Sequence, residues 1–317
     1  MKLRIVLFIA VVLLLHSQPS LAQELEILPV QSNIYMLVGA GSNITAQVGR
    51  DGVILVDAGS ADRIESVIAA VRKLVPNPNS IQGRIRYIVS TSIDLEHRGG
   101  NENVAKAGFT AGSDAGGPAV IIAHENGLNR LLELTGDARV PTPALPGNVY
   151  TGVGGIKDLF WNDDGVQIIH VPNAHTDGDS IVYFRRADVI SAGDIFVTTG
   201  YPVIDSDNGG SIQGLIDALN RLLDLTIPGR YAENGTLVIP GHGRICDELD
   251  LVEYRDMVTI IRDRIRNMIE KGATLDQVKA ARLTRDYDPE FGAGGPGAWP
   301  TDKFVEAVYK SLMAQRN

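Results

Sequence analysis

Residues 91–101, which read TSIDLEHRGGN, place two carboxylates and an imidazole within four positions. They follow the predicted strand 85–89, whose apolar residues end at Val89. In an extended stretch, alternate side chains point the same way, so Asp94 and Glu96 would face one point and His97 would point across from them. Carboxylate oxygens and imidazole nitrogens are ligands of divalent metal ions. The stretch therefore indicates a metal-binding loop.

A local role is the alternative for this stretch. Ser92 or Asp94 could cap a helix that begins near Asn101, because short polar side chains accept hydrogen bonds from the first turn of a helix. Short motifs alone do not decide between these two roles.

Three further candidate ligands lie far downstream, next to predicted strands. His175 precedes a tight turn that leads into the strand 181–184, Asp194 follows the next strand, and His242 follows another. Each residue alone is more typical of a turn or a solvated surface. Ligand sites of open α/β sheets gather where strands end, so the shared placement favours one common site.

Strands and helices alternate in both halves of the chain, which predicts a layered α/β domain. The segments 140–154 and 291–300, rich in proline and glycine, are predicted surface loops. The predicted strands are 34–38, 44–48, 52–59, 85–89, 119–123, 165–171, 180–184, 187–191 and 236–239. The predicted helices are 63–75, 125–134, 213–225, 250–273, 275–285 and 302–314.

The first 22 residues have the pattern of a secretory signal peptide. Lys2 and Arg4 precede the apolar run 5–15, and small residues follow at 20 and 22, so we expect the mature chain to begin near Gln23. A retained amphipathic anchor is the alternative. Later segments do not approach the roughly 20 apolar residues of a membrane span, so we expect no stable span after signal removal.

Composition narrows the class of protein. A hydrophobic content of 44% and a charged content of 21% are those of a globular domain. The net charge of -9 argues against nucleic acid as a partner, because a phosphate backbone requires clustered basic residues. Cys246 is the only cysteine, which excludes an internal disulfide. An exported chain without disulfides fits a bacterial periplasm at least as well as an extracellular setting, so we expect a periplasmic or secreted protein.

Five short motifs, in this order, resemble those of the metallo-β-lactamase superfamily over residues 34–243. The motifs are VDAG at 56–59, TSIDLEHRGGN at 91–101, AHTDGD at 174–179, AGD at 192–194 and PGHG at 240–243. The resemblance implies a four-layer αββα sandwich that holds one or two metal ions between the sheet edges. We expect this domain over residues 23–247, with a C-terminal helical extension over 248–317 packed on it. The extension could cover the pocket or form the surface of a homodimer.

The resemblance also implies a set of ligands. His97, His175 and His242 would bind metal, Asp194 would bridge two ions, and Asp57 would support the site from behind. Zinc is the metal that the family implies.

The central loop departs from the family pattern His-x-His-x-Asp-His. Here the stretch reads Ser92-x-Asp94-x-Glu96-His97, so serine and aspartate replace two histidines and glutamate replaces an aspartate. The two metal positions would then be formed by Asp94, His175 and Asp194, and by Glu96, His97, His242 and Asp194.

The altered loop has either decayed or been remodelled for harder ligands. Asp94, Glu96 and Asp194 in one cleft would raise each other's pKa, and divalent cations would relieve that repulsion. Neutral replacements would be more natural in a decayed site, so we favour a remodelled metal site. Oxygen-rich ligands make manganese or iron as plausible as zinc.

The resemblance implies an exported hydrolase that acts on a small-molecule substrate. A metal-bound hydroxide would attack a carbonyl group in a lactam, lactone or ester, with Asp94 and Glu96 in catalytic roles as well as ligand roles. True β-lactamase activity is not expected, because the missing histidines belong to the ion that orients the hydroxide. The alternatives are a non-catalytic binding protein with a degenerate metal site and an oxidoreductase with non-haem iron on the same fold.

Overall fold

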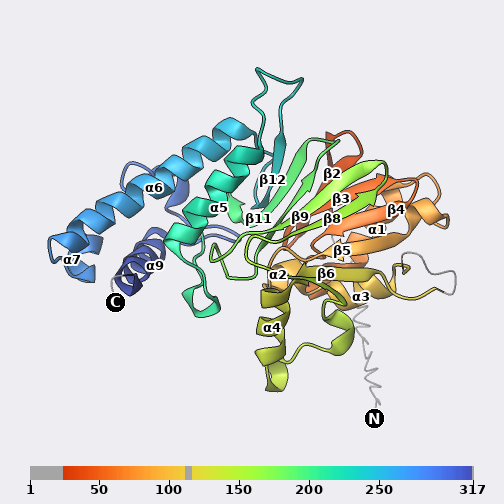
Figure 1. The fold of residues 1–317 in the computed structure, drawn as a ribbon, viewed down its shortest axis with the longest axis horizontal. Helices are drawn as coiled ribbons and strands as arrows, with labels where there is room; N and C mark the ends of the chain where they lie inside the picture. The colour runs from red at the N-terminus through yellow and green to blue at the C-terminus, as the bar shows by residue number, and fades with distance from the viewer. Residues whose placement is uncertain (1–23, 111–115, 316–317) are drawn as a thin grey trace, which may run out of the picture.

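The computed structural model describes residues 24–110 and 116–315, so the predicted signal peptide lies outside the described residues. Two β-sheets form the centre of the molecule (Figure 1). The seven strands of the first sheet follow chain order: β1 (Glu26–Gln31), β2 (Ile34–Ala40), β3 (Ser42–Gly49), β4 (Gly52–Val56), β5 (Ile85–Val89), β6 (Val120–His124) and β7 (Asn148–Tyr150). The second sheet has the order β12 (Leu237–His242), β11 (Val189–Val197), β10 (Ser180–Phe184), β9 (Asp164–His170) and β8 (Ile156–Trp161).

The two sheets pack face to face through alternate apolar side chains. In β9, Val166 and Ile168 face the first sheet, and Ile169 faces the other way. Val182 and Phe184 of β10 join Val166 in the same cluster between the sheets. This alternation is expected of strands in a sheet that buries both faces.

Helices cover the outer face of each sheet. On the first sheet these are α1 (Ile64–Leu74) and α3 (Asn101–Lys106). On the second sheet they are α5 (Ile212–Leu225), α6 (Glu248–Glu270) and α9 (Thr301–Ala314), as Figure 1 shows. The layers are therefore helix, sheet, sheet, helix, which confirms the αββα sandwich implied by the resemblance.

The C-terminal helices pack on the same core as the second sheet. A capping box at Asp247 starts α6, and apolar residues of α6 and α9 share one cluster with β11 and α5. Between them lie α7 (Leu275–Ala280) and α8 (Asp288–Phe291). The predicted helix 275–285 was therefore too long. No helix within 24–110 and 116–315 is long and apolar enough to cross a membrane. The expected boundary at residue 247 stays a prediction.

Three strands were missed from the sequence, and several were predicted too short. The predicted loop 140–154 contains β7, and β1 and β8 were not recognised. The strand β8 is a sheet edge whose alternate residues, including Phe160, are exposed, so it lacks the apolar run of a buried strand. The predicted strand 187–191 continues to Val197, past a shift in its pairing with β12.

Candidate metal centre

Five segments that are distant in sequence meet at one end of the two sheets. Asp57 directly follows β4, and residues 91–98 follow β5. His175 lies in the loop between β9 and β10. Asp194 lies within β11, beyond its predicted end, and His242 is the last residue of β12. The predicted convergence at strand ends is therefore observed for these residues.

The loop after β5 is helical rather than extended. Asp94 is the residue before α2 (Leu95–Arg98), and its side chain makes no capping hydrogen bond. Because a helical turn separates the side chains, Asp94 and Glu96 point to two different groups, and the prediction that they face one point was wrong. The capping alternative is wrong for both residues, because the helix that begins at Asn101 has Gly100 as its N-cap and no side-chain cap hydrogen bond. The Ser92 hydroxyl instead accepts a hydrogen bond from the Asp94 N–H at 3.2 Å.

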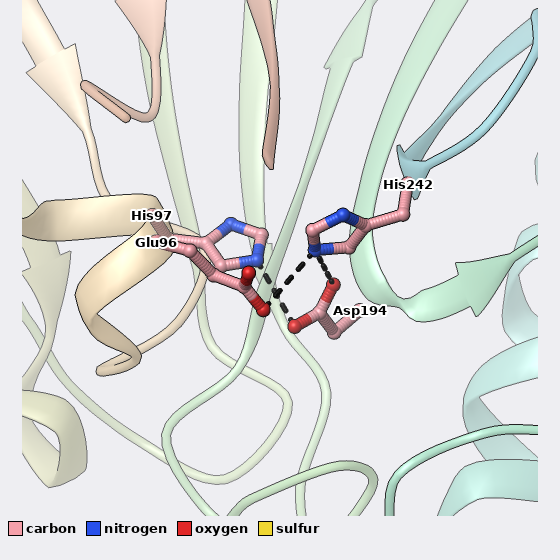
Figure 2. Close-up of side chains that lie close together, drawn as sticks. All are labelled: Glu96, His97, Asp194 and His242. Atoms are coloured by element: carbon pink, nitrogen blue, oxygen red, sulfur yellow. Dashed lines mark ion pairs between the residues drawn. The ribbon is translucent and has the colours of Figure 1, made fainter. Parts of the chain in front are cut away.

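The first group consists of Glu96, His97, Asp194 and His242 (Figure 2). The Nε2 atom of His97 lies 3.0 Å from Oδ2 of Asp194. The Nε2 atom of His242 lies 3.3 Å from Oε1 of Glu96 and 3.6 Å from Oδ1 of Asp194. One potential ligand atom from each residue falls within 4.8 Å of all the others. Two imidazoles and two carboxylates are a suitable donor set for a divalent ion.

Asp57 fixes the orientation of the His97 ring. Its Oδ2 lies 2.8 Å from Nδ1 of His97 and also accepts the hydroxyl of Thr91 at 2.7 Å, and its Oδ1 accepts the Thr91 N–H at 2.8 Å. An ionised carboxylate only accepts hydrogen bonds, so Nδ1 of His97 donates to it. The lone pair of neutral His97 is then on Nε2, which points at Asp194.

Buried atoms without hydrogen bonds mark where an ion fits. Nε2 of His97, Nε2 of His242 and Oδ1 of Asp194 are buried and have no hydrogen-bond partner among the residues that the structure describes. Such atoms are costly unless a partner satisfies them. Two acceptors, Nε2 of His97 and Oδ2 of Asp194, face each other at 3.0 Å, which requires a proton or a cation between them. The residues therefore fit a divalent metal ion.

The second group consists of Asp94, His175 and Asp194. The Nε2 atom of His175 lies 3.4 Å from Oδ2 of Asp94, and its Nδ1 lies 3.4 Å from Oδ1 of Asp179. Asp179 also accepts the N–H and hydroxyl of Thr176 at 2.6 and 2.7 Å, which holds the turn around His175. This group is poorer in nitrogen than the first, because Asp94 and Ser92 stand where the family has histidines.

The neighbouring histidines lower the pKa of Glu96 and Asp194, whereas mutual repulsion was predicted to raise it. Burial raises the pKa of Asp94, and Asp194 adds to this despite the opposing His175. The contact with the His242 imidazole, 3.3 Å away, lowers the pKa of Glu96. Burial opposes ionisation of Asp194, but the adjacent imidazoles, His97 foremost, hold its pKa below the usual range. The expected rise in pKa is therefore seen only for Asp94.

Two of the buried histidines that contact carboxylates, His97 and His175, favour the protonated form when no metal is bound. Burial alone would lower the pKa of His97, but Asp194 and Asp57 raise it well above the usual value. Burial likewise opposes protonation of His175, and Asp179, Asp194 and Asp94 raise its pKa to about 9. A metal ion must therefore displace protons from these rings.

The predicted surface loop 291–300 covers part of the site. Gly297 has φ of +65°, and a Cβ atom there would lie 1.9 Å from Cδ2 and 2.4 Å from Nε2 of His242. Only glycine allows the backbone to come this close to the ring. Trp299 then pairs with Tyr201, where its N–H donates to the Tyr201 carbonyl at 2.8 Å.

A cavity of about 480 Å³ opens beside the second group, within the usual range for small-molecule sites. The C-terminal extension therefore lines the pocket, one of the two roles expected for it. The lining residues include Asp94, His175, Val203, Ile204, Trp299 and Lys303.

The six ligands predicted from the sequence lie close together in two groups that share Asp194. Several residues around them were not predicted. Asp179 belongs to the quoted AHTDGD motif, so its position after His175 was a usable signal. Gly297 and Lys303 had no such signal, because only the fold places the C-terminal segment over the site.

Fold and site together define a class of proteins: αββα sandwiches with a histidine–carboxylate metal site at the sheet ends. The sequence model described as the metallo-beta-lactamase superfamily matches residues 29–228. The chain belongs to this family. The sequence matches no curated protein.

Solved structures with the same fold include sulfatases and lactamases. A stereoselective inverting sec-alkylsulfatase, Pisa1 from Pseudomonas sp., has a TM-score of 0.67 and 14% identity over 90% of this chain and 50% of the sulfatase. A metallo-beta-lactamase from Pontibacter korlensis has a TM-score of 0.55 and 14% identity over 74% of this chain and 99% of its own. The DIM-1 metallo-beta-lactamase has a TM-score of 0.53 and 18% identity over 74% of this chain and 97% of its own. The chain thus spans about half the length of the alkylsulfatase.

Family membership and the candidate site together support divalent metal binding and, in general, a metal-dependent hydrolase.

Proposed function

We propose that this protein is a metal-dependent hydrolase of small esters, with a carboxylic ester, a lactone or a sulfate ester as substrate. The observation that carries the proposal is the facing pair of acceptors, Nε2 of His97 and Oδ2 of Asp194, which lie 3.0 Å apart in a buried site. A metal ion that displaces the proton from His97 would satisfy both atoms, and the neighbouring cavity provides room for a small molecule.

The side chains suggest a division of work. His97, His242, Asp194 and Glu96 would hold the first ion, and Asp94, His175 and Asp194 a second. A bound divalent ion supplies positive charge that lowers the pKa of a water molecule and polarises the bond under attack.

Asp94 is the better proton acceptor of the two carboxylates expected in catalysis. Its pKa is raised, chiefly by burial, and its side chain is 37% exposed and lines the cavity. Asp94 Oδ2 would take a proton from the attacking water and return it to the leaving oxygen. Glu96 has a lowered pKa because of His242 and is therefore better suited to binding metal.

We include a sulfate ester among the candidate substrates because the structural match to the alkylsulfatase extends into the C-terminal helices. Residues 248–317 make up more than a fifth of the chain, so a structural match over 90% of it extends into these helices. The two lactamases match only 74% of the chain. The structural similarity to the sec-alkylsulfatase thus extends into residues 248–317.

A substrate panel tests this proposal. Metal-loaded protein would be given matched carboxylic esters, lactones, lactams, sulfate esters and phosphodiesters, with the His242→Ala variant as control. We expect turnover of an ester or lactone that depends on added metal and is lost in the variant. If the protein binds metal but no member of the panel is hydrolysed, the binding-protein alternative replaces the hydrolase. Bound iron with a visible absorption band and oxygen consumption would favour the oxidoreductase.

We also propose export to the periplasm or medium, based on the signal-like pattern of residues 1–22. Expression of the full chain in a bacterium, followed by fractionation and N-terminal sequencing, should give a mature protein that begins near Gln23. An intact N-terminus in the cytoplasmic fraction would refute export. The oligomeric state, a monomer or the homodimer considered above, can be measured on the same material by light scattering.

A further inference from the structure

One face of α9 forms a wall of the cavity beside the second group of ligands. Its residues follow the helical spacing i, i+3, i+4 and i+7, which places them on one side of the helix. This wall lies beyond residues 29–228, which match the family model. The four residues are Lys303, Glu306, Ala307 and Lys310.

Most of the charges that line the cavity already have partners. Glu306 lies 2.7 Å from Nζ of Lys279 and 2.8 Å from Nζ of Lys310. Asp205 accepts hydrogen bonds from the backbone and side chain of Asn208 at 3.2 and 2.7 Å. The remaining acidic residues in the lining are Asp94, which faces His175, and Asp207. The pKa of Lys310 is raised by Glu306 and, to a smaller extent, by Asp207.

Lys303 is different, because no carboxylate in the described parts of the chain forms an ion pair with it. Its Nζ instead lies 4.3 Å from the centre of the Trp299 ring. A cation over an aromatic face is held in place but keeps its charge. The ammonium group is therefore positioned at the cavity with its hydrogen-bond donors free for another partner.

Apolar side chains also line the cavity. Val203, Ile204, Trp299 and Ala307 line the same cavity. An apolar surface next to one uncompensated ammonium group suits a molecule with a hydrocarbon part and a negatively charged head.

We propose that Lys303 and Trp299 form a specificity subsite for a small amphiphilic anion, so that the natural substrate is an ester bearing a carboxylate or a sulfate beside a short hydrocarbon chain. The assignment of a substrate rests on the proposed hydrolase function, whereas anion binding at the subsite can be tested without turnover. Lys303 is a specificity residue here, and the reacting atoms belong to the ligand groups described above.

Binding can be measured without hydrolysis through the fluorescence of Trp299. The probes are hexyl sulfate, hexanoate and, as the neutral control, hexanol. We expect both anions to change the fluorescence of the wild-type protein at lower concentration than hexanol does, and the tighter anion identifies the preferred head group. The Trp299→Phe variant should lose the signal, because Trp161 lies far from the cavity lining, next to Tyr87.

The variants separate a specific contact from general charge. Lys303→Met should weaken anion binding about tenfold, the effect of losing a charged hydrogen bond, and Lys303→Arg should restore it to within about threefold. Lys271→Met removes the same charge from the exposed end of α6 and should leave binding unchanged. Unchanged anion binding in Lys303→Met, equal effects of Lys271→Met, or no anion binding by the wild type would each overturn the subsite.

Kinetics then connect the subsite to the reaction. For a pair of esters that differ only in a terminal carboxylate, Lys303→Met should raise KM for the charged ester about tenfold and leave the neutral one unchanged. If neither ester is hydrolysed, the proposed function fails and the fluorescence result still decides the subsite.

Discussion

Replacing Asp57 by asparagine tests how the site holds its metal. Asp57 is buried and accepts three hydrogen bonds, from the N–H and hydroxyl of Thr91 and from Nδ1 of His97, at 2.7 to 2.8 Å. An asparagine amide placed toward His97 is a donor where an acceptor is needed. The ring would then favour a proton on Nε2, the atom that faces Asp194.

The expected cost follows from this loss of orientation. Partners behind a metal-binding histidine typically contribute 10- to 100-fold in metal affinity, which corresponds to about 1.4 to 2.7 kcal/mol. Backbone strain does not confuse the comparison, because Asp57 has φ of +68° and asparagine tolerates this region as well as aspartate does.

The assay is a competition titration of zinc against a chromophoric chelator at fixed pH. Asp164→Asn is the matched control, because Asp164 is also buried and accepts backbone N–H groups, from Arg186 at 2.7 Å and Ala187 at 3.3 Å, far from the site at the start of β9. It should lower thermal stability and leave zinc affinity unchanged. Wild-type zinc affinity in a folded Asp57→Asn protein would refute the role of His97 as an oriented ligand.

Three further predictions concern the same site. His242→Ala should abolish the tighter zinc equivalent and Ser92→Ala should barely change it, because the Ser92 hydroxyl only accepts the N–H of Asp94; the reverse order in calorimetric titrations would contradict the assignment. Gly297→Ala should weaken zinc binding while the fold persists by circular dichroism, since the added Cβ would lie 2.4 Å from Nε2 of His242; unchanged affinity would show that the loop yields freely. Zinc affinity should rise with pH between 7 and 9, because the pKa of His175 is raised to about 9 in the folded protein and the proton competes with metal below that value; a flat profile would contradict it.

The sequence predicted the structure best where a short run of residues determines the local structure by itself. Apolar runs such as that of Gly52–Val56 identified buried strands, and the motifs that follow the strands located the ligands. By contrast, β8 was hidden because its exposed residues, Phe160 among them, give an edge strand no continuous apolar run.

Other features depend on distant packing and had no local signal. The turn Leu95–Arg98 is helical, which sends Asp94 toward His175 and Glu96 toward His242 instead of to one point. The prediction that the pKa of Asp194 is raised was wrong, because histidines lie next to this carboxylate and lower its pKa. Residue types alone do not specify this arrangement.

The sequence also did not predict that the C-terminal segment approaches the candidate metal site. The loop 291–300 resembles any exposed glycine-rich turn, yet Gly297 contacts the ring of His242 and Trp299 borders the cavity. Only the packing of α9 on the second sheet brings them there.

Metal content tests the central claim most directly. The protein would be purified without chelator and analysed for transition metals by mass spectrometry, then reconstituted with zinc, manganese or iron(II). One to two equivalents of a divalent metal, lost on chelation and recovered on reconstitution, is the predicted result. Less than about a tenth of an equivalent of any metal, with none regained on reconstitution of folded protein, would contradict it.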